Sequence, residues 1–309
     1  MTTSTHAGSR PDTAREPEAQ PGAAGVDVAT AGRYLCVCAD DFGMSDGINA
    51  AVLDLADRGK ISATGCMVLR AAWTSGVVGL RGLRGLRASQ FDVGLHLDLS
   101  PPDPGTMSEP GLGVLILKSY LRLLRPERVR AEIRDQLARF EDELDRAPAF
   151  VDGHRHVHQF PVVREMLTKE IVHRYGESTP WIRNTEPLAA HGFAISKADV
   201  VFALGGARLL ALANARKIPM SRRMLGVYDF AGTTDDYRQR LQGWIANCRS
   251  GDVLMCHPSR GSPNDPFDAA RQQEYEVLRG TMFPVQALNG TVYLSPLSHL
   301  LRAGHPSPA

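Results

Sequence analysis

The sequence predicts an α/β fold in which mostly parallel strands form a barrel or an incomplete barrel. From Tyr34 onward, short apolar runs alternate with longer segments whose apolar residues recur at helical spacing. Repeated strand–helix units of this kind build a parallel sheet covered by helices. With about seven strands, such a sheet is expected to curve into a barrel or most of one.

Each expected element has a local signal. The run YLCVCAD from Tyr34 is apolar and β-rich, and segment 45–59 begins with a serine that can cap a helix and ends at a glycine. Segment 126–146 is amphipathic with interleaved charges, and segment 161–176 has a proline near its first turn. Further strands are expected at 61–69, 91–99, 149–158, 180–186 and 252–258, a helix at 234–251, and a strand with a short helix within 291–304.

Two stretches, 112–124 and 200–213, are unusually apolar. Charged residues interrupt both, and both are shorter than the roughly 20 residues of a membrane-spanning helix. We expect buried or interface helices, and an apolar lid beside an active site is the alternative.

The composition is that of an ordinary globular protein, with 43% hydrophobic and 22% charged residues in a chain of 309. The net charge of +1 gives no electrostatic reason to expect nucleic acid or an anionic membrane as the main partner. The oligomeric state is left open, a homodimer included.

Residues 1–32 are rich in small, polar and charged residues and lack an apolar core. They predict a disordered N-terminal tail, not a signal peptide or a membrane span, followed by one domain over 33–309. The five cysteines are odd in number and scattered, which favours reduced thiols packed as small apolar side chains. Reduced thiols in turn favour a cytoplasmic protein.

Polar residues stand where several expected strands end. Asp40 and Asp41 close the first strand, His96 lies near the end of the third, His154 near the end of the fourth, and His257 follows VLMC late in the chain. In barrels, functional side chains gather at the carboxyl ends of the strands. We therefore expect these residues to meet at one mouth.

The stretch VDGHRHVHQF, residues 151–160, has the most unusual composition. On a strand, Asp152, His154, His156 and His158 would share one face. A row of imidazoles is a poor core surface but a good wall for a metal or proton-transfer site. Alternate strand residues lie roughly 6.6 Å apart, so one of the three histidines can bind an ion and the others are second-layer groups, substrate contacts or proton shuttles.

The paired carboxylates of Asp40 and Asp41 repel each other when both are ionised, and a cation or a shared proton relieves that conflict. A turn with a helix cap is the simpler explanation of two adjacent aspartates. The histidines of the same fold favour a site instead, because one aspartate and two histidines leave open coordination positions for water and substrate.

Four segments carry a family resemblance. CADDFGMSDGINAAVLDLADRGKISATGCMVL, VGLHLDLS, FVDGHRHVHQFP and VLMCHPSRG resemble, in order, the signature segments of the YdjC/ChbG-like carbohydrate deacetylases. The resemblance runs from about Tyr34 to the C-terminus. It implies an irregular (β/α) barrel, a divalent metal, and removal of acetyl groups from N-acetylated amino sugars.

The resemblance also implies a metal-binding set of Asp41, His96 and His154. The metal would be Mg²⁺ by resemblance, and the ligand types also admit Zn²⁺ or Mn²⁺. Asp40 is expected to act as general base and His257 as the acid that protonates the leaving amine.

His156 and His158 are the alternative acids. Their other expected role is to contact the substrate or to shuttle protons. Arg183, on the segment WIRNTE, is expected to orient Asp40 or the substrate, and a surface arginine is the alternative. The substrate is a chitin-type oligosaccharide or a lipid-linked sugar. A non-catalytic sugar- or partner-binding protein on the same fold, and a metal hydrolase acting on another bond, are the competing hypotheses.

Overall fold

The computed structural model describes residues 32–87, 90–100, 111–188 and 195–303. Except for Gly32, the predicted N-terminal tail lies outside the described residues.

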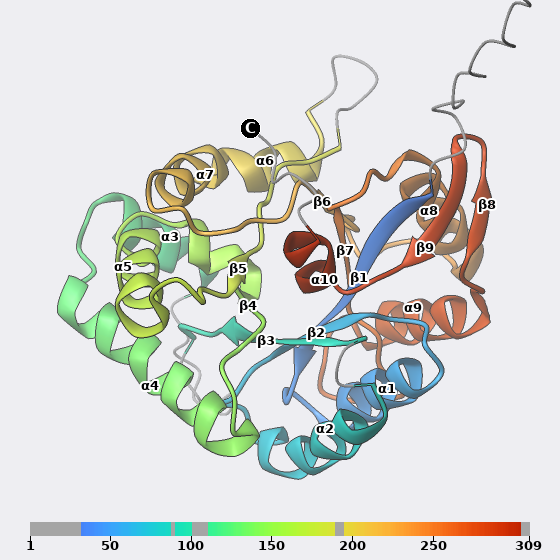
Figure 1. The fold of residues 1–309 in the computed structure, drawn as a ribbon, viewed down its shortest axis with the longest axis horizontal. Helices are drawn as coiled ribbons and strands as arrows, with labels where there is room; N and C mark the ends of the chain where they lie inside the picture. Colours follow the sequence, from blue (N-terminus) through green and yellow to red (C-terminus); the bar gives the residue numbers. More distant parts are fainter. Residues whose placement is uncertain (1–31, 88–89, 101–110, 189–194, 304–309) are drawn as a thin grey trace, which may run out of the picture.

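Parallel strands form the centre of the fold (Figure 1). Along the sheet their order is β5-β4-β3-β2-β1-β7-β6, and each neighbouring pair is parallel. The strands are β1 (Arg33–Phe42), β2 (Ala63–Cys66), β3 (Asp92–Leu97), β4 (Phe150–Gly153), β5 (Trp181–Ile182), β6 (Met224–Leu225) and β7 (Val253–Cys256). The predicted fold class is confirmed.

The barrel is incomplete between β5 and β6. No continuous ladder joins these two strands in the described chain, but isolated parallel bridges link Ile182 to Met220 and Pro187 to Met224. An antiparallel hairpin of β8 (Val285–Ala287) and β9 (Gly290–Leu294) is added where β9 pairs with the start of β1.

Helices surround the strands (Figure 1). They are α1 (Asp46–Asp57), α2 (Trp73–Arg87), α3 (Leu112–Tyr120), α4 (Pro126–Leu144), α5 (Val163–Tyr175), α6 (Lys197–Ala203), α7 (Gly206–Ala215), α8 (Thr234–Asn247), α9 (Asp268–Gly280) and α10 (Leu297–Arg302). The predicted cap of α1 is present, because the Ser45 side chain accepts a hydrogen bond from the Ile48 amide.

Alternate residues of β1 belong to two different apolar clusters. Leu35, Val37 and Ala39 join the large cluster beneath the helices. Cys36 and Cys38 face a smaller cluster that also holds side chains from β2, β4, β5, β7 and α10. Because side chains alternate along a strand, this second cluster is the barrel interior, and α10 lies over one end of it. All five cysteines are free and buried, as expected.

The helices expected at 112–124 and 200–213 are present, but they are only partly buried. Helix α7 buries Leu209 and Ala213, but α6 has no buried residue and Ser119 is the buried residue of α3. Among the described residues, no single helix is long and apolar enough to span a membrane. Helices α6 and α7 meet that test only together, with a bend of 49° between them.

Candidate metal and acid–base site

The two aspartates at the end of β1 reach one site because the backbone turns at the second. Cys36, Cys38 and Asp40 alternate along β1 and so share its inner face. Asp41 would point outward with Ala39 on a regular strand, but its φ of 66° lies in the left-handed region. Both aspartates are nearly inaccessible to solvent.

Asp41, His96 and His154 converge from β1, β3 and the segment after β4. Oδ1 of Asp41 lies 2.9 Å from Nδ1 of His154 and 3.4 Å from Nε2 of His96. One donor atom from each residue lies within 4.8 Å of the other two. Two imidazole nitrogens and one carboxylate are a donor set that binds divalent cations and leaves positions open for water. The chemistry of these three residues therefore fits the metal that the family resemblance implies.

Asp40, His96 and Asp152 also lie close enough together to be considered as a cation site. Both carboxylates of this second group are already paired with Arg183. A cation there would adjoin a buried guanidinium, so the group with Asp41 is the better site.

Asp152 fixes the orientation of His96. The two residues are direct partners across the β3–β4 pair, and Oδ1 of Asp152 lies 2.6 Å from Nδ1 of His96. This contact leaves Nε2 of His96 directed toward Asp41. A carboxylate behind a ligating histidine is the usual second layer of a metal site. The spacing of residues 152–158 predicts that Asp152 lies near the site but indicates no role for it.

Arg183 is buried, with 1% of its area exposed, so the alternative of a surface arginine is wrong. Its Nη1 and Nη2 donate to Oδ2 and Oδ1 of Asp40 at 2.6 and 2.7 Å. Nη2 also lies 2.6 Å from Oδ2 of Asp152. The guanidinium thus holds Asp40 in a fixed orientation and joins it to the carboxylate behind His96.

The expectation of a strand through His158 is wrong. Strand β4 ends at Gly153, and His154–Gln159 form a 3₁₀ turn in which Arg155 and His156 have φ values of 52° and 58°. The three histidines therefore point in different directions instead of forming one row. His154 contacts Asp41, while Nε2 of the buried His158 donates to the backbone carbonyl of Arg183 at 3.1 Å.

His156 is half-buried beside His158, with ring centroids 6.5 Å apart. Burial lowers the pKa of His158 to about 4, and burial together with His158 lowers that of His156 well below its ordinary value. Both rings are neutral at pH 7.

The ligand group is strongly polarised. Burial opposes the charged form of Asp41, but Arg271 and His154 outweigh it and hold the pKa of this carboxyl well below its ordinary value. Nη2 of Arg271, from α9, donates to Oδ2 of Asp41 at 2.7 Å. For His96, burial is outweighed by Asp152 and Asp40, which raise its pKa well above the ordinary value. A bound cation would displace the proton that this raised pKa keeps on the His96 ring.

His257 follows β7 and is held by Glu274 of α9. Its amide donates to Oε2 of Glu274 at 2.6 Å, and its ring packs edge-on against Phe230 at 5.1 Å. Within the described chain Nδ1 is buried without a hydrogen-bond partner, and Oε1 of Glu274 lies 3.9 Å from it. Burial lowers the pKa of His257 to about 4, so the ring is neutral at pH 7. Glu274 and Arg271 were missed because no helix was expected at 268–280.

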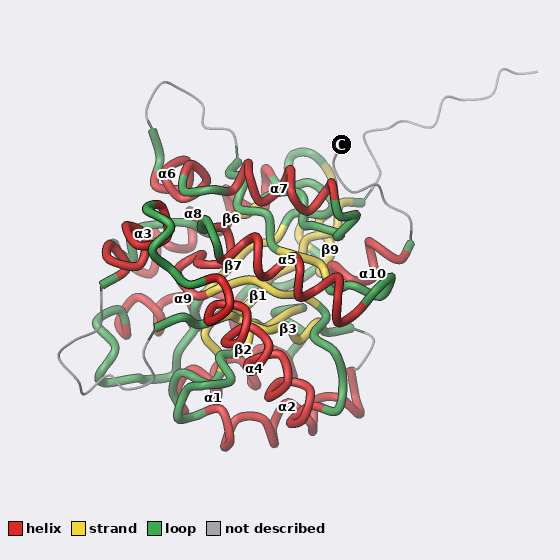
Figure 2. The backbone as a smooth tube through the Cα atoms, turned by 90° about the vertical axis from the view of Figure 1, so that its left-hand side faces the viewer, coloured by secondary structure: helices red, strands yellow, loops and turns green. Residues whose placement is uncertain are grey.

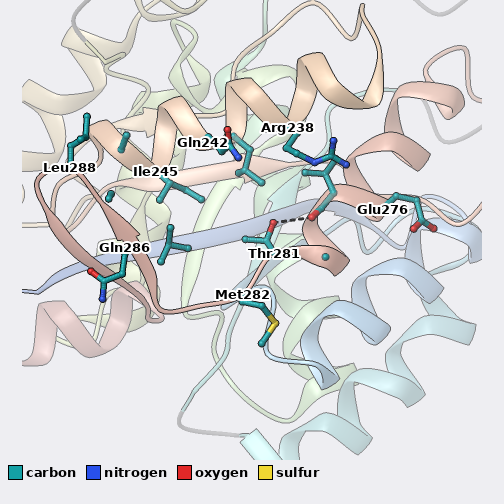
Figure 3. Close-up of a pocket in the computed structure, with 14 residues that line it drawn as sticks. Arg238, Gln242, Ile245, Glu276, Thr281, Met282, Gln286 and Leu288 are labelled. Carbon is teal, nitrogen blue, oxygen red and sulfur yellow. Dashed lines mark hydrogen bonds between the residues drawn. The ribbon is translucent and has the colours of Figure 1, made fainter.

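A separate surface hollow of about 830 Å³ lies between α8, α9 and the β8–β9 hairpin (Figure 3). Ile245, Thr281 and Leu288 are among its lining residues, and it shares none with the site above.

Barrel and site together place the chain among (β/α)-barrel proteins that carry a two-histidine, one-carboxylate cluster at the carboxyl ends of their strands. Residues 34–286 match the family described as YdjC-like protein, and the chain belongs to this family.

Curated relatives match over part of their length. A chitooligosaccharide deacetylase of Enterobacter sp. (strain 638) is 30% identical over 168 residues, which are 54% of this chain and 65% of the relative. A carbohydrate deacetylase of Danio rerio is 27% identical over 147 residues, 44% of this chain and 45% of the relative. The chain thus spans less than two thirds of the curated relatives it matches.

A solved structure supports the fold. A candidate cellobiose-phosphate cleavage protein of Enterococcus faecalis V583 is 18% identical to this chain, with a TM-score of 0.58. The match covers 81% of this chain and 92% of that one.

Proposed function

We propose that this protein hydrolyses the acetamide C–N bond of an N-acetylated amino sugar with a divalent cation held by Asp41, His96 and His154. The main support is the convergence of these three side chains beside Asp40 at the carboxyl ends of the strands. The names of the curated relatives support the same substrate class.

When bound, the cation would polarise the acetamide carbonyl and lower the pKa of a water molecule. Mg²⁺ is the metal proposed from the family resemblance, and Zn²⁺ and Mn²⁺ accept the same donors.

Asp40 is the proposed general base. Its carboxylate adjoins the ligand group and accepts two hydrogen bonds from Arg183, which fix its plane. A fixed carboxylate can take a proton from the attacking water without first reorienting. Arg183 is therefore a positioning residue for the base.

His257 is the proposed proton donor to the leaving amine. Because its pKa is lowered to about 4, its ring is neutral at pH 7 and must gain a proton within the turnover before it can donate one. The proton that Asp40 takes from the attacking water must therefore pass to His257 before the amine leaves, which keeps the overall reaction in proton balance. The pKa of His158 is lowered to about 4 as well, so this requirement does not separate the two histidines.

The substrate is a chitin-type oligosaccharide or a lipid-linked amino sugar, and the free buried cysteines fit the reducing cytoplasm proposed as the location.

Acetate release from a panel of N-acetylated sugars tests the proposal. We expect release that EDTA abolishes and that Mg²⁺, Zn²⁺ or Mn²⁺ restores, and a His96→Ala variant should release none. Release that persists after complete metal removal would reject the metal-dependent mechanism. Sugar binding without acetate release under every metal would favour the non-catalytic alternative.

A further inference from the structure

Helix α3 is apolar on two opposite sides. Leu112, Leu115 and Ile116 face the protein, where they are partly buried against the core. Val114 and Leu117, at i and i+3, and Leu121 just beyond the helix lie on the other side and are 41%, 57% and 59% exposed. An outward helix face in a water-soluble environment is normally polar, so this one requires a partner.

Positive charge surrounds these exposed side chains. Lys118, Arg122 and Arg125 are exposed, and residues 112–125 contain no aspartate or glutamate. Within the part of the chain that the structure describes, none of the three cations forms an ion pair. Tyr120 and Leu123 are also exposed, by 46% and 65%. We call these exposed residues the α3 patch: Val114, Leu117, Lys118, Tyr120, Leu121, Arg122, Leu123 and Arg125.

Helix α3 is anchored to the chain that follows the site. On the buried side of α3, the Ser119 hydroxyl donates to the carbonyl of Pro161 at 2.6 Å, two residues beyond the turn that begins at His154. Figures 1 and 2 both show α3 at the outside of the fold, and Figure 1 shows it next to α5. The α3 patch therefore lies on the outward side of a helix whose buried side holds the segment after His154.

We propose that the α3 patch docks on the surface of an anionic lipid bilayer. Leucine and tyrosine side chains can enter the boundary between headgroups and acyl chains, while lysine and arginine pair with anionic headgroups. A second copy of the chain fits less well, because a two-fold symmetric contact would bring the three unpaired cations of one copy against those of the other. The net charge of +1 conceals this local cluster.

Flotation of the full chain with lipid vesicles tests the proposal. The vesicles are phosphatidylcholine alone and phosphatidylcholine mixed with phosphatidylglycerol. We expect binding to the mixed vesicles that weakens as salt is raised, and little binding to phosphatidylcholine alone.

Two variants separate the charged and apolar contributions. Lys118→Gln with Arg122→Gln and Arg125→Gln should bind the mixed vesicles about 100-fold more weakly, at about fivefold for each cation near the surface. Leu117→Ser with Leu121→Ser should lose at least about tenfold. All these positions are exposed, so each variant should fold, and circular dichroism would check this.

Matched controls come from the opposite side of the molecule. Leu288, on the β8–β9 turn, is 98% exposed, and Leu288→Ser should bind vesicles as the wild type does. Wild-type failure to bind mixed vesicles at low salt would overturn the proposal, as would equal binding by the wild type and both α3 variants. A wild-type dimer that these variants convert to monomer, without any vesicle binding, would assign the patch to self-association instead. Flotation does not depend on turnover, so its outcome is separate from that of the acetate assay.

Discussion

Glu274 allows a quantitative test of the buried network behind His257. Its side chain is fully buried and accepts hydrogen bonds from the His257 amide at 2.6 Å, the Tyr228 hydroxyl at 2.8 Å and the Tyr237 hydroxyl at 3.4 Å. Burial nevertheless dominates and raises the pKa of this carboxyl from 4.5 to about 7. The proposed perturbation is Glu274→Gln, which keeps the size of the side chain and removes its titration.

The sign of the effect follows from the direction of the pKa shift. A carboxyl whose pKa is higher in the folded than in the unfolded protein contributes stability that is fully present below pH 4.5 and is lost as the pH rises through about 7. At about 1.4 kcal/mol for each pKa unit, the contribution lost is about 3 kcal/mol. The wild type should lose this amount in addition to any change that the variant shares.

Urea unfolding in EDTA measures the effect, since EDTA removes the linkage to metal binding. The free energy of unfolding is compared at about pH 4.5 and about pH 8.5 for the wild type and Glu274→Gln. We expect the wild type to lose about 3 kcal/mol more than the variant across this interval. Parallel pH dependences for the two proteins would refute the reasoning.

The remaining predictions concern the ligand group, the base and the tail. His96→Ala and His154→Ala should each lose stoichiometric metal with the fold intact, and full metal occupancy in both would reject this ligand assignment. Asp40→Asn should keep its metal and lose roughly 10² to 10⁴ in turnover, whereas Asp41→Asn should bind metal weakly and recover partly with excess metal. Metal analysis of the two variants side by side would reveal reversed roles. Deletion of the residues before Arg33 should leave the free energy of unfolding and the turnover unchanged. A lower value of either would show that the tail contributes to the folded protein.

Much of the fold could be predicted because its signals are local. The first strand, the capped helix after it and the amphipathic α4 appear close to the expected positions. Strands β5 and β6 have two residues each. Whether these two strands pair with each other depends on how nearly the barrel closes, and no local sequence pattern encodes that closure.

The histidine segment shows why alternation can mislead. Asp152, His154, His156 and His158 have the spacing of a strand face, but the left-handed residues Arg155 and His156 turn the chain. Non-glycine residues rarely adopt this conformation, and because neither position is a glycine or an asparagine, no local signal marks the turn.

The meeting of Asp41, His96 and His154 could be expected from the rule that strand ends share one rim. The role of Asp152 could have been found from register, since it lies opposite His96 on the neighbouring strand. Arg271 and Glu274 depended on an unpredicted helix, although their spacing of three residues places both on one face of it.

The position of β1 bears on how the chain folds during synthesis. One edge of this first strand pairs with β2 and, at its start, with β9, where Tyr34 meets Tyr293. The other edge waits for β7, where Cys36 meets Val253. Until those late residues leave the ribosome, β1 has an unpaired edge that can pair with another nascent chain. Contacts so distant in sequence also close slowly. Chaperone contact during translation is therefore expected to concentrate on the interval before the last sixty or so residues emerge.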